Sequence, residues 1–156
     1  MMRKWLMTGR GVGGVGNFAG VMRKIDEIIV HCTATPAGRE VSVEEIAGWH
    51  RRQGFRTVGY HYVVRLDGTV EPGRRESETG AHCLGHNSRS IGVCYVGGLD
   101  SAGKPADTRT GAQKAALLRL LGELRARYRG ATIHGHCEFA AKACPCFDAA
   151  AEYAGL

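Results

Sequence analysis

The feature that most constrains the fold is a series of short apolar runs, rich in β-branched residues and bounded by turn residues. The runs cover residues 25–32, 60–66, 91–96 and, more briefly, 131–133. Apolar runs of this length are typical of buried strands rather than helices. The second run is followed by Asp-Gly at 67–68, a pair that predicts a β-hairpin continuing into Thr69 and Val70.

Three helical segments are predicted between and after these strands. Ser42 and Glu45 have the spacing of a capping box that opens a helix to about Gln53. Thr110 and Gln113 repeat this spacing and open a longer amphipathic helix to about residue 128. The leucines expected to face the core on that helix are Leu117, Leu118, Leu121 and Leu124. A shorter helix is predicted over 147–153, so the fold class is α/β, with a central mixed sheet flanked by helices.

Length and composition indicate one domain. The chain has 156 residues, of which 44% are hydrophobic and 23% charged, close to the average for globular proteins. No apolar stretch reaches the roughly 18 residues that a membrane-spanning helix needs. We therefore expect no membrane span and, in this size range, a monomer.

The formal net charge of +6 favours anionic partners in general. The basic residues are scattered in short runs, and no motif for nucleic-acid binding accompanies them. We therefore expect a solvated basic surface and no nucleic-acid partner. The hypothesis of a nucleic-acid binder rests on the net charge alone. Such a protein would bind arbitrary DNA, and its affinity would fall steeply as the salt concentration rises.

Residues 1–21 differ from the rest of the chain. Three basic residues precede a glycine-rich apolar stretch, GVGGVGNFAGV, which weakly resembles a secretion sequence but is too rich in glycine for a stable helix. No clear cleavage site follows, and patterned sequence begins at Met22. We interpret 1–21 as an N-terminal extension, native or added, and 22–156 as the domain.

The chain has six cysteines. A core of this size does not need disulfide bonds, and the sequence lacks a convincing secretion sequence, so we expect most of them to be reduced. Cys32 and Cys94 lie within apolar runs and are predicted to be core residues.

The predicted strand ends carry residues suited to zinc. His31 lies at the end of the first run and His136 follows the last, with Cys144 eight residues later. Two imidazoles and a thiolate form a set that catalytic zinc sites use, leaving one position open. Spacing alone leaves alternatives, because any of these histidines could be a hydrogen-bonded core residue. The competing neighbours are His134, Cys32, Cys137 and Cys146.

Five stretches resemble a known family. They are IDEIIVHCTAT (25–35), WHRRQGF (49–55), VGYHYVVRLDGTVEPGR (58–74), SRSIGVCYVGGLD (88–100) and HCEFAAKACPCFD (136–148). In this order they resemble the type 2 N-acetylmuramoyl-L-alanine amidases, which include the "lysozymes" of T-odd phages and the animal peptidoglycan-recognition proteins. The resemblance covers nearly all of 25–150 and is closest to the phage enzymes.

The resemblance implies a metal site and two catalytic groups. His31, His136 and Cys144 correspond to the zinc ligands, and Tyr60 and Lys142 to catalytic groups beside the metal. Zinc acidifies water and polarises an amide carbonyl, and a cationic or hydrogen-bonding partner stabilises the oxyanion that forms. Either Tyr60 or Lys142 could protonate the leaving amine.

Neighbouring residues receive more modest predictions. Trp49 is expected in the core, and His50 is expected to form a hydrogen bond from its helix. His61 should point away from the site, because it alternates with Tyr60 along a strand. Glu138 is a candidate hydrogen-bond partner of a ligand. The irregular stretch 71–89 is long enough to be functional, and its candidates for lining a peptide groove are His82, His86 and Asn87.

The resemblance implies a zinc-dependent enzyme that cuts the amide bond between N-acetylmuramic acid and L-alanine in bacterial peptidoglycan. It further implies a phage or prophage endolysin, made in the bacterial cytoplasm and acting on the cell wall after release. The alternative is a non-catalytic peptidoglycan-binding module, as some relatives are. Those relatives typically lack the cysteine ligand, so Cys144 favours the enzyme.

Overall fold

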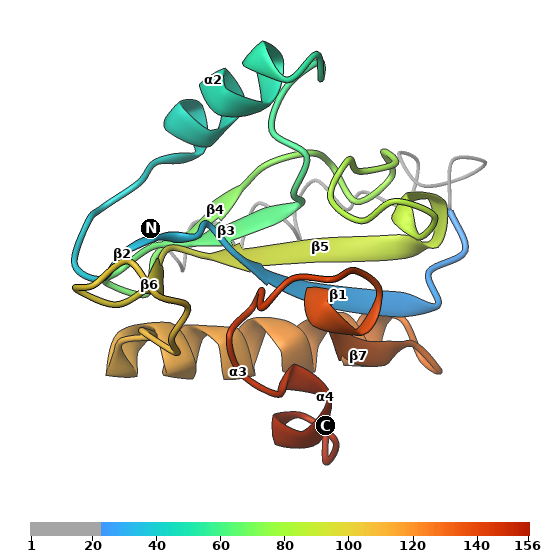
Figure 1. The fold of residues 1–156 in the computed structure, drawn as a ribbon. Coiled ribbons are helices and arrows are strands. Elements are labelled where there is room, and N and C mark those ends of the chain that lie inside the picture. The colour runs from blue at the N-terminus through green and yellow to red at the C-terminus, as the bar shows by residue number, and fades with distance from the viewer. Residues whose placement is uncertain (1–22) are drawn as a thin grey trace.

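The computed structural model describes residues 23–156, so the predicted extension at 1–21 lies outside the described residues. A five-stranded sheet with the order β4-β3-β5-β1-β7 forms its centre (Figure 1). The strands are β1 (Glu27–Cys32), β3 (Tyr62–Val64), β4 (Val70–Pro72), β5 (Ser90–Tyr95) and β7 (Thr132–Gly135). β1 pairs in parallel with both β5 and β7, and β3 pairs in parallel with β5, whereas β4 is antiparallel. The predicted mixed sheet is confirmed.

Helices cover both faces of the sheet. Figure 1 shows α2 (Val43–Arg52) on one face and α3 (Gly111–Arg127) with α4 (Ala149–Glu152) on the other. Because side chains alternate along a strand, neighbouring residues enter different cores. Val30 packs in the core beneath α3, whereas Val63 and Cys94 pack with Ile46 of α2. His31, which follows Val30, therefore belongs to the α2 face.

One residue of α3 was assigned to the wrong face. Leu117, Leu121 and Leu124 are buried as predicted, but Leu118 is 52% exposed, and Leu120 takes its place in the core. A helix turns about 100° per residue, so positions 117, 120, 121 and 124 form one stripe and position 118 lies beside it.

The two helix starts differ in their capping. Thr110 and Gln113 form the complete reciprocal box, in which the side chain of each residue accepts the backbone N–H of the other. At the other helix only half of the box forms: the Ser42 hydroxyl accepts the Glu45 N–H, while the Glu45 carboxylate pairs with Arg39. A nearby guanidinium thus competes successfully for the carboxylate.

Two connections complete the framework. The predicted Asp-Gly hairpin is confirmed, with Gly68 at φ +86° in the turn that joins β3 to β4. A second sheet, which the sequence did not predict, pairs β2 (Thr35–Pro36) with β6 (Gly98–Leu99). Two short 3-10 turns, η2 (Asn87–Arg89) and η3 (His136–Glu138), follow the long loop and β7.

All six cysteines are free thiols, and Cys32 and Cys94 are buried as expected. Among residues 23–156, no helix is long and apolar enough to cross a membrane.

His61 is buried next to β3 and uses both of its ring nitrogens. The Gly92 N–H donates to Nδ1 at 3.0 Å, so in the neutral ring Nε2 carries the proton and donates to the Glu78 carbonyl at 2.8 Å. Burial lowers the pKa of His61 from 6.5 to about 4, because the charged ring would lose its hydration, and the nearby Arg23 guanidinium lowers it as well.

The depressed pKa of His61 predicts acid sensitivity of the fold. The unfolded chain binds the proton near pH 6.5 and the folded chain only near pH 4, so the contribution of this ring is complete above pH 6.5 and is lost as the pH falls. Between pH 7 and 5 it should amount to about 2 kcal/mol of the free energy of unfolding. Urea unfolding of the metal-free protein at a series of pH values measures this loss. The His61→Gln variant should show a shallower slope, and an unchanged slope would contradict the assignment.

Candidate metal centre

The sheet brings His31 and His136 together. β1 and β7 run parallel with Val30 opposite Gly135, so the next residue on each lies at the same end of the sheet. The two rings have centroids 4.6 Å apart. His31 is 1% exposed and His136 9% exposed. The carboxyl ends of parallel strands are where open α/β sheets place their ligands.

Cys144 reaches this edge on a loop held by three hydrogen bonds. The Cys137 N–H donates to the Cys144 carbonyl at 2.7 Å, and the buried Tyr95 hydroxyl donates to the Pro145 carbonyl at 2.7 Å. The Cys32 N–H donates to Cys144 Sγ at 3.2 Å. These three hydrogen bonds fix the position of the sulfur at the edge of the sheet.

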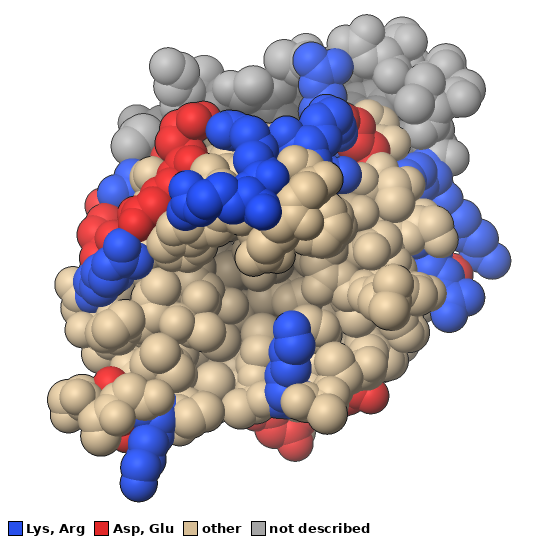
Figure 2. All heavy atoms as spheres, turned by 45° about the horizontal axis from the view of Figure 1, so that its top comes forward, with Lys and Arg blue, Asp and Glu red and all other residues tan. Residues whose placement is uncertain are grey.

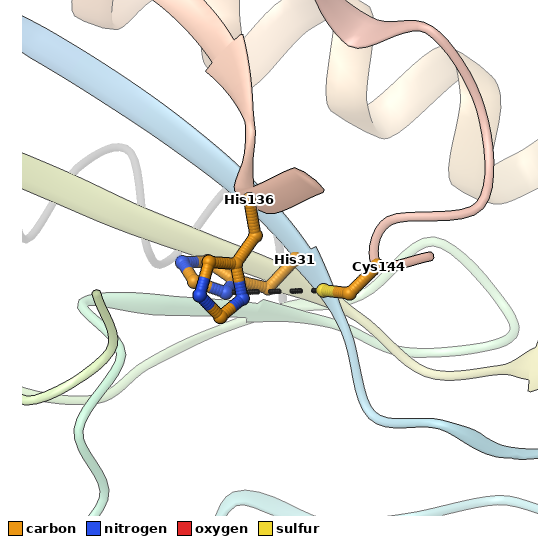
Figure 3. A group of neighbouring side chains, drawn as sticks. All are labelled: His31, His136 and Cys144. Atoms are coloured by element: carbon orange, nitrogen blue, oxygen red, sulfur yellow. Dashed lines mark hydrogen bonds between the residues drawn. The ribbon is translucent and has the colours of Figure 1, made fainter. Parts of the chain in front are cut away.

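These three side chains converge (Figure 3). His31 Nδ1 lies 3.9 Å from Cys144 Sγ, and one donor atom from each residue lies within 4.8 Å of the others. Ligand atoms at about 2.0–2.3 Å from a shared zinc ion are separated by such distances. The set of two nitrogens and one sulfur therefore fits a zinc ion.

The competing residues of the sequence analysis have other partners. His134 contacts Thr132 Oγ1 and the Glu138 carboxylate through its two nitrogens. Cys146 Sγ donates to the Gly98 carbonyl at 3.4 Å and lies 3.9 Å from Cys32 Sγ. Cys137 is exposed. Within the described part of the chain, the group that could hold a metal consists of His31, His136 and Cys144.

The electrostatics of the cluster keep both imidazoles neutral. Burial, followed by the positive potential of His82, His136 and Lys142, lowers the pKa of His31 well below its usual value. Burial and Lys142 also lower the pKa of His136. A neutral imidazole has the free lone pair that a metal requires.

Tyr60 and Lys142 both lie near this cluster. The Tyr60 ring has its centroid 5.1 Å from that of His31, and burial raises the pKa of its hydroxyl well above 10. Tyr60 therefore keeps its proton and can donate a hydrogen bond. Lys142 is exposed on the loop between His136 and Cys144, and its charge lowers the pKa of both histidines.

His50 packs near Tyr60, with ring centroids 5.4 Å apart. It accepts the Gly59 N–H, as expected of a residue that forms a hydrogen bond from its helix.

Comparison with known proteins decides the family. Residues 21–147 match the family N-acetylmuramoyl-L-alanine amidase. The chain belongs to this family. The predicted resemblance and enzyme class are thereby confirmed.

Phage enzymes are among the relatives of this amidase. It is 49% identical over 126 residues to the endolysin of Klebsiella phage KP32, covering 81% of this chain and 83% of that one. It is 50% identical over 123 residues to the endolysin of Escherichia phage T7, covering 79% and 82%. The solved structure of the endolysin N-acetylmuramoyl-L-alanine amidase LysCS from Clostridium intestinale is 26% identical, with a TM-score of 0.69 and coverage of 79% and 76%.

The face of the amidase that carries α2 is hollowed. Figure 2 shows a depression near the middle of this face, with mostly uncharged surface around it and Lys and Arg side chains gathered on one side. The last turn of α2 carries two exposed arginines, Arg51 and Arg52.

Two assignments near the amidase cluster differ from the sequence analysis. Glu138 was considered as a partner of a ligand, but its carboxylate contacts His134 and the Gly135 N–H, where it caps η3. His82 was considered as a groove residue, but its Nδ1 lies 2.8 Å from His31 Nε2. No short-range sequence pattern links positions 31 and 82, so only the tertiary structure could reveal this contact.

Proposed function

We propose that the chain hydrolyses the amide bond between N-acetylmuramic acid and L-alanine in bacterial peptidoglycan, using one zinc ion held by His31, His136 and Cys144. The observation that carries the proposal is the convergence of these three donors at the sheet edge in a member of the amidase family. Members of this family are typically zinc-dependent. Imidazole nitrogen and thiolate sulfur are donors that zinc binds, and three protein ligands would leave its fourth position open.

A bound zinc ion would acidify water and polarise the amide carbonyl. The protein supplies the rest of the chemistry. Tyr60 holds a protonated hydroxyl beside His31, so it can donate a hydrogen bond to the oxygen that becomes negative during the attack. Lys142 adds a positive charge near His136 and would stabilise the same developing charge.

The departing amine of alanine must gain a proton. Tyr60 and Lys142 both carry a transferable proton, and both lie around the three donors. A group in this position accelerates bond cleavage by general acid catalysis. One of these two groups would supply the proton.

Peptidoglycan is the partner that the amidase family implies, and a muramyl peptide is the part that the site would recognise. The similarity to phage endolysins supports an endolysin, made in the bacterial cytoplasm and active on the wall after release, and we propose that it acts as a monomer. A binding module that does not cut is the alternative, and the presence of the sulfur donor Cys144 together with both histidines favours the enzyme.

The zinc assignment predicts about one zinc ion per purified chain. Cys144→Ser should lose most of this metal, because serine replaces the thiolate with a poor zinc ligand. Cys146→Ser is the matched control, two residues away, and should keep its zinc. Elemental analysis after dialysis against buffer measures both. The opposite pattern would move the sulfur ligand to Cys146.

The catalytic assignment predicts that Tyr60→Phe and Lys142→Ala keep zinc but lose activity. Removal of one donor to a developing negative charge lowers turnover by about 10²–10³-fold. Turnover on purified peptidoglycan, zinc content and thermal unfolding are measured on the same samples. Loss of zinc in either variant would give that residue a structural role instead.

The proposed reaction predicts which bond is cut. Digestion should release stem peptides with a new alanine amino terminus and leave long glycan strands. A glycosidase would instead need a pair of carboxylates flanking the sugar bond. Chelator should stop the release of peptides and added zinc should restore it. New reducing sugar ends in place of amino termini would exclude the amidase reaction, and binding without either product would support the non-catalytic module.

A further inference from the structure

We infer that His82 is a positioning residue for the metal site, which fixes the tautomer and orientation of His31 with the help of Ser90. The inference rests on the proposed zinc site and adds a residue that does not touch the metal. It depends on the contacts of three side chains, His31, His82 and Ser90, which come from β1, the long loop and β5.

The two nitrogens of His31 face different partners. Nδ1 lies 3.9 Å from Cys144 Sγ, toward the donor cluster. Nε2 lies 2.8 Å from His82 Nδ1. For Nδ1 to offer its lone pair to a metal, the proton of the neutral ring must be on Nε2, where it can be donated to His82.

The direction of this hydrogen bond determines the next one. His82 accepts at Nδ1, so its own proton is on Nε2, which lies 3.2 Å from Ser90 Oγ. Ser90 is fully buried at the start of β5. His31 therefore donates to His82, and His82 donates to Ser90. With the hydrogen bonds in this direction, the Nδ1 lone pair of His31 is free for a metal.

The loop is built to hold His82 in this position. Asn87 Oδ1 accepts the backbone N–H groups of His82 and Cys83, at 2.8 and 2.9 Å. Two glycines leave room for the ring: a Cβ at Gly92 would lie 2.6 Å from His82 Cδ2, and a Cβ at Gly80 would lie 2.7 Å from it. The ring is thus fixed by backbone contacts on one side and close packing on the other.

A second histidine of the same loop offers a matched control. His86 Nδ1 pairs with the Glu27 carboxylate at 2.8 Å, and its ring stacks on Phe139. Replacing His86 removes an imidazole from the same loop and leaves the contacts of His31 with His82, Tyr60 and His136 in place. An effect confined to His82 therefore separates positioning of the ligand from disturbance of the loop.

The test measures metal affinity by competition with a chromogenic chelator. His82→Phe keeps a planar ring but has no acceptor for His31, and its zinc dissociation constant should rise by about 10–100-fold. His82→Asn can still present an acceptor near the Nδ1 position and should recover part of the affinity. His86→Phe should bind zinc as the wild type does. Cobalt substituted for zinc should show an altered visible spectrum in His82→Phe, because the freed His31 ring reorients.

The outcomes separate this inference from the proposed function. A wild-type protein that binds no zinc would remove the basis of both. Wild-type affinity in His82→Phe, with zinc bound normally by the unmodified chain, would overturn the positioning role alone. Equal losses in His82→Phe and His86→Phe would also overturn it. Should His82→Phe fail to fold, as judged by thermal unfolding without metal, His82→Ala introduces no larger group and decides by the same measurement.

Discussion

The parallel pairing of β1 with β7 is the interaction on which the site depends. It sets Val30 opposite Gly135, and every later feature of the cluster follows from this register. His31 and His136 are more than a hundred residues apart in the chain. They meet because His31 directly follows Val30 and His136 directly follows Gly135. Because a slip of one residue turns every side chain to the other face, the register also determines that His31 points toward α2 and not into the core beneath α3.

The core and the site share residues, and this explains where the third donor of the cluster lies. Tyr95 is fully buried beneath the sheet, yet its hydroxyl anchors the carbonyl of Pro145 beside Cys144. Cys32 belongs to the same core, and its backbone N–H points at Cys144 Sγ. Gly98 lies so close to Cys32 that a Cβ would be 2.6 Å from its sulfur. Close packing of the core thus determines where the third donor lies.

The sequence predicts those parts of the structure that local patterns specify. Short apolar runs predicted the main strands, and the placement of His31 and His136 at strand ends followed from them. Local patterns did not predict contacts whose partner lies outside the pattern. Examples are the ion pair between Arg39 and Glu45 and the contact between His82 and His31. Spacing could not separate Cys144 from Cys146, because their positions depend on how the loop packs against Tyr95 and Cys32. The resemblance to the amidases supplied that choice, as well as Tyr60 and Lys142.

The burial of the cluster also lowers the pKa of its two histidines. A histidine in water is half protonated near pH 6.5, and a proton on its free nitrogen competes with a metal. Burial and the charge of Lys142 lower the pKa of His31 and His136, so the neutral form persists to lower pH than in an exposed histidine. Lys142 contributes to this while remaining exposed, which spares it the cost of burying a charge. Burial and one nearby cation thus act in the same direction on the two histidines, and in the proposed reaction the same cation would stabilise the anion that forms when the substrate is attacked.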